Sequence, residues 1–514
     1  MERRDFLSDI AFYSAVSVGV PNIWRVTTRP KLADYPFTLG VASGDPTPTG
    51  AVIWTRLAPK PLDPDGGLEG QRIVSAWQVS EDEQFTKVVR QGNVTTAPEL
   101  SNTAHVDVNG LQSDRWYFYR FSAGDAVSPI GRLRTTPAPG AATPLRFGFV
   151  SCQHYEQGYY TAYEHLAKES RLELVVHLGD YIYEYGPTEG RIRRYASAEA
   201  RTVDQYRARY AQTKTDPLLQ AAHAAAPWVV TWDDHEVDNN YAASVGELGM
   251  ESEEQMRMRR AAGYQAWWEH QPVRVPRVRS WSDLNITRRI EWGATASFHV
   301  MDTRQYRSDQ ACGDGNQNVP CGDWNSPERT LLGTAQEQWL DAGLEASRAR
   351  WQVLANQVRV APFDERVGAG ERVHMDAWSG YPAALNRLLT SVANRAPNRT
   401  VALTGDIHSS WVNELRTQYQ RPDAKAIGAE FIGTSISSGG DGSDTFPGWN
   451  DGTRAENPHC IWHNGRRGYV MCDVGTDEWK ASYRVVPVIS RPGGDVNTAA
   501  EFVVQNGRPG VTKV

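Results

Sequence analysis

The stretch Leu174-Val-Val-His-Leu-Gly-Asp-Tyr-Ile-Tyr-Glu184 joins a short apolar run to a turn of residues that can bind metal. Five further apolar runs lie in the same part of the chain, separated by stretches of helical pattern, at residues 147–150, 228–231, 298–301, 351–354 and 401–403. Near-continuous apolar strands that alternate with helices are typical of a layered α/β fold. The sequence therefore predicts an α/β domain over residues 145–514.

Five of these six runs end directly in residues that bind metal ions in proteins. The first run is followed by Ser151-Cys152-Gln153-His154, the run ending at Thr231 by Trp232-Asp-Asp-His-Glu236, and the run ending at Met301 by Asp302-Thr-Arg304. Ligands of open α/β sheets bind beyond the carboxyl ends of the strands, so we expect these side chains to converge on one site. The candidate residues are Cys152, Asp180, Tyr183, Asp234, His235, Asn240, Asp406 and His408.

The candidate ligands divide into two chemical kinds. The thiolate of Cys152, the phenolate of Tyr183 and the imidazole of His408 suit a transition metal such as Fe³⁺ or Zn²⁺. Four other candidates offer only oxygen, which suits Ca²⁺ or Mg²⁺: Asp45, Asp234, Asn240 and Asp406. Two neighbouring cations suit the hydrolysis of phosphate esters, because they shield the charge of the ester and make water a stronger nucleophile.

Each of these residues also has an ordinary structural explanation. A lone Asp after a buried strand is more often the N-cap of a helix than a ligand, and a lone Cys in a strand usually belongs to the core. The combination is harder to explain in this way. Gly-Asp after one strand, Asp-Asp-His-Glu after another and Gly-Asp-Ile-His after a third favour a metal centre.

Residues 34–137 have an all-β pattern. Alternating segments such as Ala51–Arg56, Ile73–Val79 and Trp116–Phe121 are separated by turns rich in Gly, Pro and Asp. Strands of this spacing predict a sandwich of the immunoglobulin or fibronectin kind. The Pro- and Thr-rich stretch Thr135–Pro144 reads as a linker to the α/β domain.

Composition excludes several classes of protein. A chain of 514 residues is long enough for two domains, and 40% hydrophobic with 22% charged residues is typical of a globular protein. The formal net charge of -7 does not favour non-specific binding to nucleic acid. After the first twenty residues, no stretch is apolar enough for long enough to span a bilayer, so we expect no transmembrane anchor.

The N-terminus resembles a signal for twin-arginine export. Arg3-Arg4-Asp-Phe-Leu7 precedes a mildly apolar stretch from Ile10 to Val20, although no A-x-A cleavage site follows. The alternative is a solvated N-terminus that carries two arginines. We expect residues 1–33 to form an export signal and lead-in. The protein would then be periplasmic, bound to the cell wall or secreted.

Disulfides are compatible with an exported protein. Of the five cysteines, two pairs could each close a small loop, Cys312 with Cys321 and Cys460 with Cys472. Cys152 is then left unpaired, at the end of an apolar strand.

The motifs together resemble the PhoD-type alkaline phosphatases, a branch of the calcineurin-like metallophosphoesterases related to purple acid phosphatases. The likeness covers nearly the whole chain. It rests on the segments Gly40–Pro46, Trp54–Arg56, Ser151–Gln153, Gly179–Glu184, Trp232–Glu236 and Thr404–His408.

This resemblance implies a site with one iron and two calcium ions, for which Zn²⁺ or Mn²⁺ is the alternative. It assigns Fe³⁺ to Cys152, Asp180, Tyr183 and His408. It assigns Ca²⁺ to Asp45, Asp180, Asp234, Asn240 and Asp406, with Asp180 as the bridge. His235 would protonate the leaving group, and an arginine between Arg191 and Arg209 would contact the phosphate.

The expected activity is the release of phosphate from esters by water or hydroxide activated at the metals. An alternative enzyme of the same fold is a phosphodiesterase or phospholipase that acts on teichoic acid, phospholipid or nucleic acid. A non-enzymatic alternative is a cell-surface binding module that works through the β sandwich. The presence of every motif in the α/β part argues against the binding module. The sequence leaves the oligomeric state open.

Overall fold

The computed structural model describes residues 32, 34–247, 249–421 and 423–514. The twin-arginine motif and the apolar stretch after it lie outside these residues. Within the described part, none of the helices combines the length and the apolar character that a membrane crossing requires.

The largest sheet has ten strands, in the order β24-β23-β22-β21-β9-β10-β11-β1-β2-β5. Strands β9, β10, β11 and β1 run parallel to one another. The strands of this sheet are β1 (Val41–Thr47), β2 (Gly50–Arg56), β5 (Thr103–Val108), β9 (Leu145–Val150), β10 (Leu174–His177), β11 (Trp228–Val230), β21 (Gly468–Val474), β22 (Glu478–Val485), β23 (Asn497–Gln505) and β24 (Thr512–Lys513).

A second sheet has seven strands, in the order β12-β13-β15-β17-β19-β18-β20. Its central strands β13, β15, β17 and β19 are parallel. The strands are β12 (Arg288–Trp292), β13 (Ala296–Val300), β15 (Trp351–Ala355), β17 (Thr400–Thr404), β18 (Ser410–Arg416), β19 (Ala426–Ile432) and β20 (Cys460–Asn464).

Two smaller sheets complete the β structure. One contains β3 (Ile73–Ser80), β4 (Val88–Thr96), β6 (Trp116–Ala123), β7 (Ala126–Val127) and β8 (Gly131–Arg134). The other pairs β14 (Asn316–Val319) with β16 (Glu371–His374). The α-helices are α1 (Thr161–Lys168), α2 (Val203–Lys214), α3 (Pro217–Ala225), α4 (Glu253–His270), α5 (Thr334–Ala346), α6 (Pro382–Arg395) and α7 (Asp451–Glu456).

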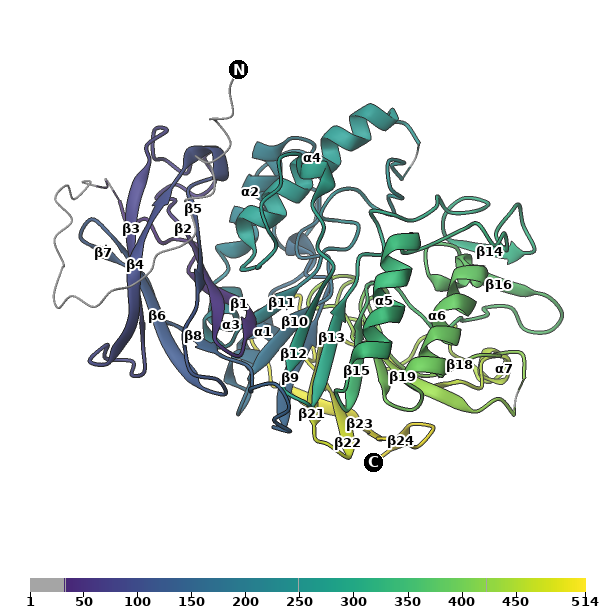
Figure 1. The fold of residues 1–514 in the computed structure, drawn as a ribbon. Helices are drawn as coiled ribbons and strands as arrows, with labels where there is room; N and C mark the ends of the chain where they lie inside the picture. The colour runs from purple at the N-terminus through teal and green to yellow at the C-terminus, as the bar shows by residue number, and fades with distance from the viewer. Residues whose placement is uncertain (1–31, 33, 248, 422) are drawn as a thin grey trace, which may run out of the picture.

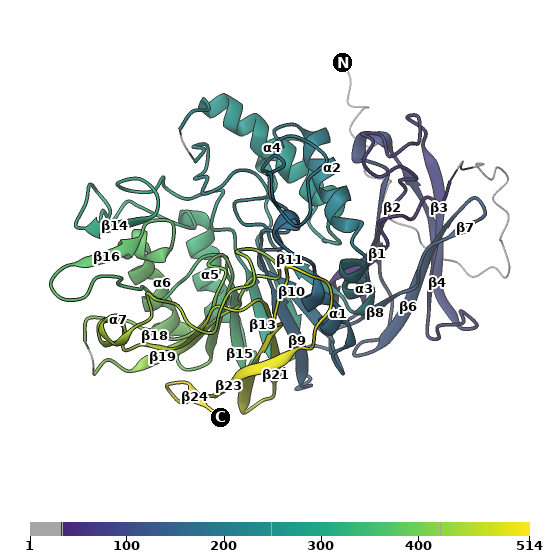
Figure 2. The ribbon, with the colours of Figure 1, turned by 180° about the vertical axis from the view of Figure 1, so that it is seen from behind.

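The two large sheets face each other, and helices cover their outer faces (Figure 1). The core between the sheets joins residues such as Phe147 and Val176 of the first sheet to Phe298 and Val401 of the second. Helices α1 to α4 pack on the outside of the first sheet, and α5 and α6 on the outside of the second. Strand β21, from the C-terminal part of the chain, pairs with β9, as Figure 2 shows from behind. The predicted layered α/β fold is confirmed, with a strand at each of the six apolar runs.

Local sequence signals explain where several helices begin. Helices α2 and α4 each start with a capping box, formed by Thr202 with Gln205 and by Ser252 with Gln255. Such a box satisfies two backbone N–H groups at the helix start that have no partner within the helix. Asp216 caps α3, whose first residue is a proline, a residue that loses no hydrogen bond in that position.

The N-terminal β region differs from a separate sandwich. The three predicted segments are present as β2, β3 and β6, and two layers pack around residues such as Ile53, Val79 and Tyr119. One of these layers, however, is the end of the ten-stranded sheet, because β1 pairs in parallel with β11 through Gly44 and Trp228. The predicted boundary near residue 137 is therefore crossed by a continuous sheet.

The predicted pairing of Cys460 with Cys472 is wrong. Both cysteines are free and buried, whereas Cys312 and Cys321 form the predicted disulfide. Cys460 lies on β20 in the seven-stranded sheet, and Cys472 lies on β21 in the ten-stranded sheet. Although the two cysteines are close in sequence, the chain passes from one sheet to the other between them, so they do not close a loop.

Candidate metal centre

The predicted ligands meet where parallel strands of both sheets end. Cys152 follows β9, Asp180 follows β10 and Asp234 follows β11, whereas Asp406 and His408 follow β17 of the second sheet. The residues of the first group, Cys152, Asp180 and His408, bring their ligand atoms within 4.8 Å of one another. The site is therefore built between the two sheets rather than on one of them.

Tyr183 joins the first group through its phenolic oxygen. That oxygen lies 2.9 Å from Oδ2 of Asp180 and 3.1 Å from Nε2 of His408. The hydroxyl of Ser438 donates to the same phenolic oxygen at 2.7 Å, which fixes its position from the opposite loop. Thiol, carboxyl, phenol and imidazole thus surround one point, a donor set that suits a transition metal.

Two further groups extend from the first. Asp180, Asp234 and His235 form one, and Asp233, Asp234 and Asp406 form the other, each again within 4.8 Å. Asp180 belongs to the first two groups and Asp234 to the last two. The structure thus places a shared carboxylate between neighbouring candidate sites, which is where a bridging ligand between two cations would lie.

Several carboxylate oxygens of these groups lack a hydrogen-bond partner. Oδ1 of Asp180 and Oδ2 of Asp233 are buried and accept no hydrogen bond within the described residues, and Oδ1 of Asp234 has only the guanidinium of Arg304, 3.5 Å away. An unsatisfied buried carboxylate oxygen costs free energy unless a cation or a donor compensates it. These orphaned oxygens show that the residues present fit the binding of cations.

The pKa values of several candidate ligands are raised in the absence of a cation. Burial and the neighbouring charge of Asp180 raise the pKa of the Cys152 thiol well above its ordinary value. Burial likewise raises the pKa of Asp180, although His235 opposes the shift, and it raises the pKa of Asp406 to about 7. A raised pKa favours the protonated form of each group, so the binding of a cation would be coupled to the release of protons.

The backbone at the predicted ligands is strained. Cys152, Asp180, Asn240, Asp406 and His408 all have a positive φ, between 51° and 65°. Residues with a side chain avoid this region, at a cost of roughly 1–3 kcal/mol each. Such strain persists only where the surrounding structure enforces it, and it gathers at functional sites.

Glycines explain why Gly-Asp recurs in this sequence. A Cβ atom on Gly179 would lie 2.4 Å from the Cβ of Asp233, and one on Gly405 would lie 2.7 Å from Oγ of Ser151. The absence of a side chain at Gly179 lets the loops after the neighbouring strands β10 and β11 touch, and its absence at Gly405 lets the loop after β17 touch the loop after β9 of the other sheet. The buried carboxylate of Glu236 ties two of these loops together, because it accepts hydrogen bonds from the backbone N–H groups of Asp180, Tyr181 and Asp233.

His235 is held by a carboxylate on its far side. Its Nδ1 lies 2.8 Å from Oε2 of Glu184, and its ring packs against that of Tyr183 with centroids 4.1 Å apart. Burial lowers the pKa of His235, but the carboxylates of Glu184, Asp234 and Asp180 outweigh it and raise the pKa well above its ordinary value. Because Glu184 occupies Nδ1, the other ring nitrogen, Nε2, is the one available at the cluster, either as a metal ligand or as a proton donor.

Asn240 lies beside the oxygen-rich part of the cluster. Its backbone N–H donates to Oδ2 of Asp234 at 2.7 Å. Burial raises the pKa of Asp314 in the disulfide loop, and the side chain of Asn240 opposes this shift. Asp45 is not brought to the cluster. Its two carboxylate oxygens lie 2.8 and 2.9 Å from the guanidinium of Arg288, and one also accepts from the backbone N–H of Arg274.

Arg304 is the main residue of the site to which the sequence analysis gave no role. It is fully buried, with Nη1 2.8 Å from both carboxylate oxygens of Asp376 and Nε 2.5 Å from Oδ1 of Asp233. Its Nη2 points between Asp234, at 3.5 Å, and Asp406, at 3.8 Å. The only sequence signal was its place directly after a strand, in Asp302-Thr-Arg304.

The expected arginine for substrate can be narrowed. Arg193, Arg207 and Arg209 are committed to partners within the protein: Asp216, Glu269 and the carbonyl of Ala198, respectively. Arg191 is exposed, and its charge contributes to lowering the pKa of the buried imidazole of His154. Arg201 pairs with Glu199 and Glu251, so Arg191 and Arg194, both exposed, are the arginines of this segment left available to a ligand.

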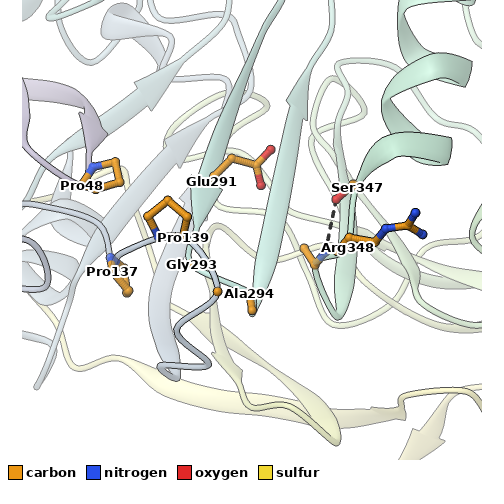
Figure 3. Close-up of a pocket in the computed structure, with 10 residues that line it drawn as sticks. Pro48, Pro137, Pro139, Glu291, Gly293, Ala294, Ser347 and Arg348 are labelled. Atoms are coloured by element: carbon orange, nitrogen blue, oxygen red, sulfur yellow. Dashed lines mark hydrogen bonds between the residues drawn. The ribbon is translucent and has the colours of Figure 1, made fainter.

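A cavity of about 300 Å³ elsewhere does not belong to this centre. It lies between the linker residues Pro137 and Pro139, the β12–β13 turn and Arg348 (Figure 3). The turn residues Gly293 and Ala294 precede β13, whereas the residues near the metal centre follow its carboxyl end. The cavity is therefore at the opposite end of the strands.

Known proteins resemble the chain over its whole length. Residues 147–483 match the family described as PhoD-like phosphatase, and residues 24–137 match the N-terminal domain of the same family. Alkaline phosphatase D of Bacillus subtilis (strain 168) is 46% identical over 524 residues, which covers 100% of this chain and 89% of the relative.

Solved structures agree. A structure described as that of PhoD has a TM-score of 0.92 at 48% identity and covers 94% of this chain and 93% of its own. The purple acid phosphatase PPD1 from seeds of yellow lupin (Lupinus luteus) has a TM-score of 0.56 at 13% identity, with 92% of this chain and 74% of its own covered. The second likeness concerns the fold alone.

Proposed function

The chain belongs to the PhoD-like phosphatase family and is a phosphoric ester hydrolase of the alkaline phosphatase kind, and we propose that it works through a mixed metal centre built on Asp180. The observation that carries the proposal is the position of this carboxylate. Asp180 takes part in two of the three candidate groups, and its Oδ1 is buried without a hydrogen-bond partner.

The proposed ligands keep the division into two chemical kinds. Fe³⁺ would be held by Cys152, Asp180, Tyr183 and His408, whose ligand atoms gather around one point. Ca²⁺, in one or two sites, would be held by oxygens of Asp180, Asp234, Asn240 and Asp406. Asp233 joins this set through its free Oδ2, and Asp45 leaves it because Arg288 neutralises its carboxylate.

When bound, two such cations lower the pKa of water and neutralise charge on the phosphoryl oxygens. The chain itself orients the ester and handles the proton of the leaving group. Glu184 holds His235 through Nδ1, so that Nε2 can deliver a proton toward the departing oxygen. This assignment makes His235 the general acid and Glu184 its positioning residue.

The proposal extends to export by the twin-arginine route, with release of phosphate outside the cytoplasm. It is supported by Arg3 and Arg4 ahead of an apolar stretch. This route carries folded proteins, which suits a site whose ligands are buried between two sheets and would be loaded before export. Replacement of Arg3 and Arg4 by lysine should leave the protein in the cytoplasmic fraction, and unchanged export of that variant would contradict the proposal.

Two measurements test the activity and the metals. Rates on a nitrophenyl phosphate monoester and on the corresponding diester, side by side, distinguish a phosphatase from a phosphodiesterase or phospholipase. Elemental analysis of protein purified from its own host distinguishes iron and calcium from zinc or manganese. A protein that hydrolyses neither ester, or that contains neither metal when active, would overturn the corresponding part.

A further inference from the structure

His154 lies next to the candidate iron ligands but is not one of them. Its ring packs against that of Tyr183 with centroids 4.3 Å apart, so Tyr183 contacts the imidazoles of both His154 and His235. The backbone of His154 is anchored from the opposite loop, since its N–H donates to Oγ of Ser438 at 3.1 Å and its carbonyl accepts from Ser437 at 3.0 Å. His154 is therefore held beside the cluster by Tyr183 at its ring and by Ser437 and Ser438 at its backbone.

The hydrogen bonds of His154 determine where its proton sits. The side chain caps the short helix Tyr155–Gln157, and Nδ1 accepts from the backbone N–H of Glu156 at 3.2 Å. A ring nitrogen that accepts carries no proton, so the proton of the neutral ring is on Nε2. Nε2 has no hydrogen-bond partner within the described residues, and it is not among the fully enclosed polar atoms.

The two imidazoles beside Tyr183 therefore offer different Nε2 atoms. At His235 the carboxylate of Glu184 holds the proton on Nδ1, and Nε2 is free to gain or lose one. At His154 a backbone N–H occupies Nδ1, and Nε2–H can only donate. The first arrangement suits proton transfer, whereas the second suits the binding of an oxygen that carries negative charge.

We propose that His154 is a substrate-binding residue whose Nε2–H donates to a phosphoryl oxygen of the ester and of the phosphate product. This inference rests on the proposed function and adds a contact to it. The donor is fixed before substrate arrives, because the backbone of Glu156 and the ring of Tyr183 hold the imidazole. A donor positioned in advance stabilises an anion without the cost of reorganisation.

Two variants distinguish the loss of the Nε2–H donor from the loss of the structural role of the ring. His154→Asn keeps an acceptor for the N–H of Glu156, since Asn is a good N-cap, but it is too short to replace Nε2. His154→Phe keeps the aromatic contact and removes both nitrogens. His165→Asn is the matched control. His165 is on helix α1, outside the cluster, and its ring bonds to the carbonyl of Gly494.

The probe is inorganic phosphate, measured by titration calorimetry on the metal-loaded protein, together with KM and kcat on nitrophenyl phosphate. Loss of a hydrogen bond to a charged group corresponds to a factor of roughly 10 to 100 in affinity. We expect His154→Asn and His154→Phe to raise the Kd of phosphate and KM by about that factor, with metal content unchanged. His165→Asn should behave as the wild type.

Wild-type phosphate affinity and KM in His154→Asn would overturn the inference, and so would loss of iron from that variant, because His154 would then support the metal site alone. A wild type that binds phosphate but hydrolyses no ester would contradict the proposed function instead. The Kd of phosphate in the variants would still decide the role of His154 in that case.

Discussion

The phenolic oxygen of Tyr183 lies 3.1 Å from Nε2 of His408, although the two residues are 225 positions apart in the chain. The first follows a strand of the ten-stranded sheet, and the second follows a strand of the seven-stranded sheet. A cation between them would therefore join the two sheets. The same contact makes the phenol the most informative spectroscopic probe of the site.

Tyr183→Phe tests the phenolate ligand. A phenolate bound to Fe³⁺ gives a visible charge-transfer band, so concentrated wild type should be violet to brown. The variant should lose or strongly shift the band and contain less iron. Tyr185→Phe is the control, because Tyr185 is partly exposed and should leave the colour intact. A colourless wild type with full iron occupancy would show that Tyr183 is not a ligand.

Brief treatment with EGTA tests the division of the metals. Sites made only of oxygen exchange calcium readily, whereas a site with thiolate and phenolate should retain iron. Activity should disappear on treatment and return with added calcium, while the iron content stays constant. Full activity of the calcium-free protein would contradict a mixed centre.

His235→Ala separates a general acid from a ligand. Loss of a general acid slows the reaction by about 10²–10⁴-fold, mainly for poor leaving groups. Activity on alkyl phosphates should therefore fall much more than activity on nitrophenyl phosphate, with both metals retained. Glu184→Gln should cause a smaller loss of the same kind, because it weakens the hold on Nδ1.

Two outcomes would change the role of His235. Equal slowing of both substrates would indicate a residue that binds the phosphoryl oxygens. Loss of metal would identify it as a ligand, in keeping with its place in the group of Asp180 and Asp234.

Metal loading should depend on pH in a definite direction. The raised pKa values of Cys152 and Asp180, and that of Asp406 at about 7, mean that the metal-free site holds protons near neutrality. A cation must displace them, so calcium affinity should fall as the pH drops through about 7, where the carboxylate of Asp406 gains its proton. Calorimetry in buffers of different ionisation heats should detect proton release. Affinity that is constant from about pH 5 to about pH 8 would contradict these assignments.

Thiol mapping tests the cysteines. Alkylation of the unfolded, unreduced protein should label Cys152, Cys460 and Cys472, and leave Cys312 and Cys321 linked. Any disulfide that includes Cys152 would remove it from the proposed iron ligands.

The strands of the site were predictable from the sequence, because one pattern, an apolar run followed by a metal-binding residue, marks both the strand and the candidate ligand. An apolar run that stops at Cys152 or Asp180 locates both the end of a buried strand and the side chain beyond it. The parallel order of β9, β10 and β11 then brings those ends to one edge. The rule does not give the approach of Asp406 and His408, which follow a strand of the second sheet and reach this edge through the packing of the two sheets.

Other features depend on contacts that no local pattern encodes. Asp45 matches a family motif, but its partner Arg288 lies 243 residues away and occupies the carboxylate. Arg304 is flanked by ordinary strand-end residues, and only the packed structure shows four aspartates around it. The spacing of Cys460 and Cys472 cannot show that the chain changes sheets between them.

The pairing of β1 with β11 has a consequence for how this protein can be divided. A chain that began after the linker would keep every ligand residue of the α/β part but would expose the hydrogen-bonding edge of β11. Such an edge recruits other strands, so the shortened chain should associate with itself rather than remain a smaller enzyme. The N-terminal segment thus covers an edge of the sheet whose strands lead into Cys152, Asp180 and Asp234.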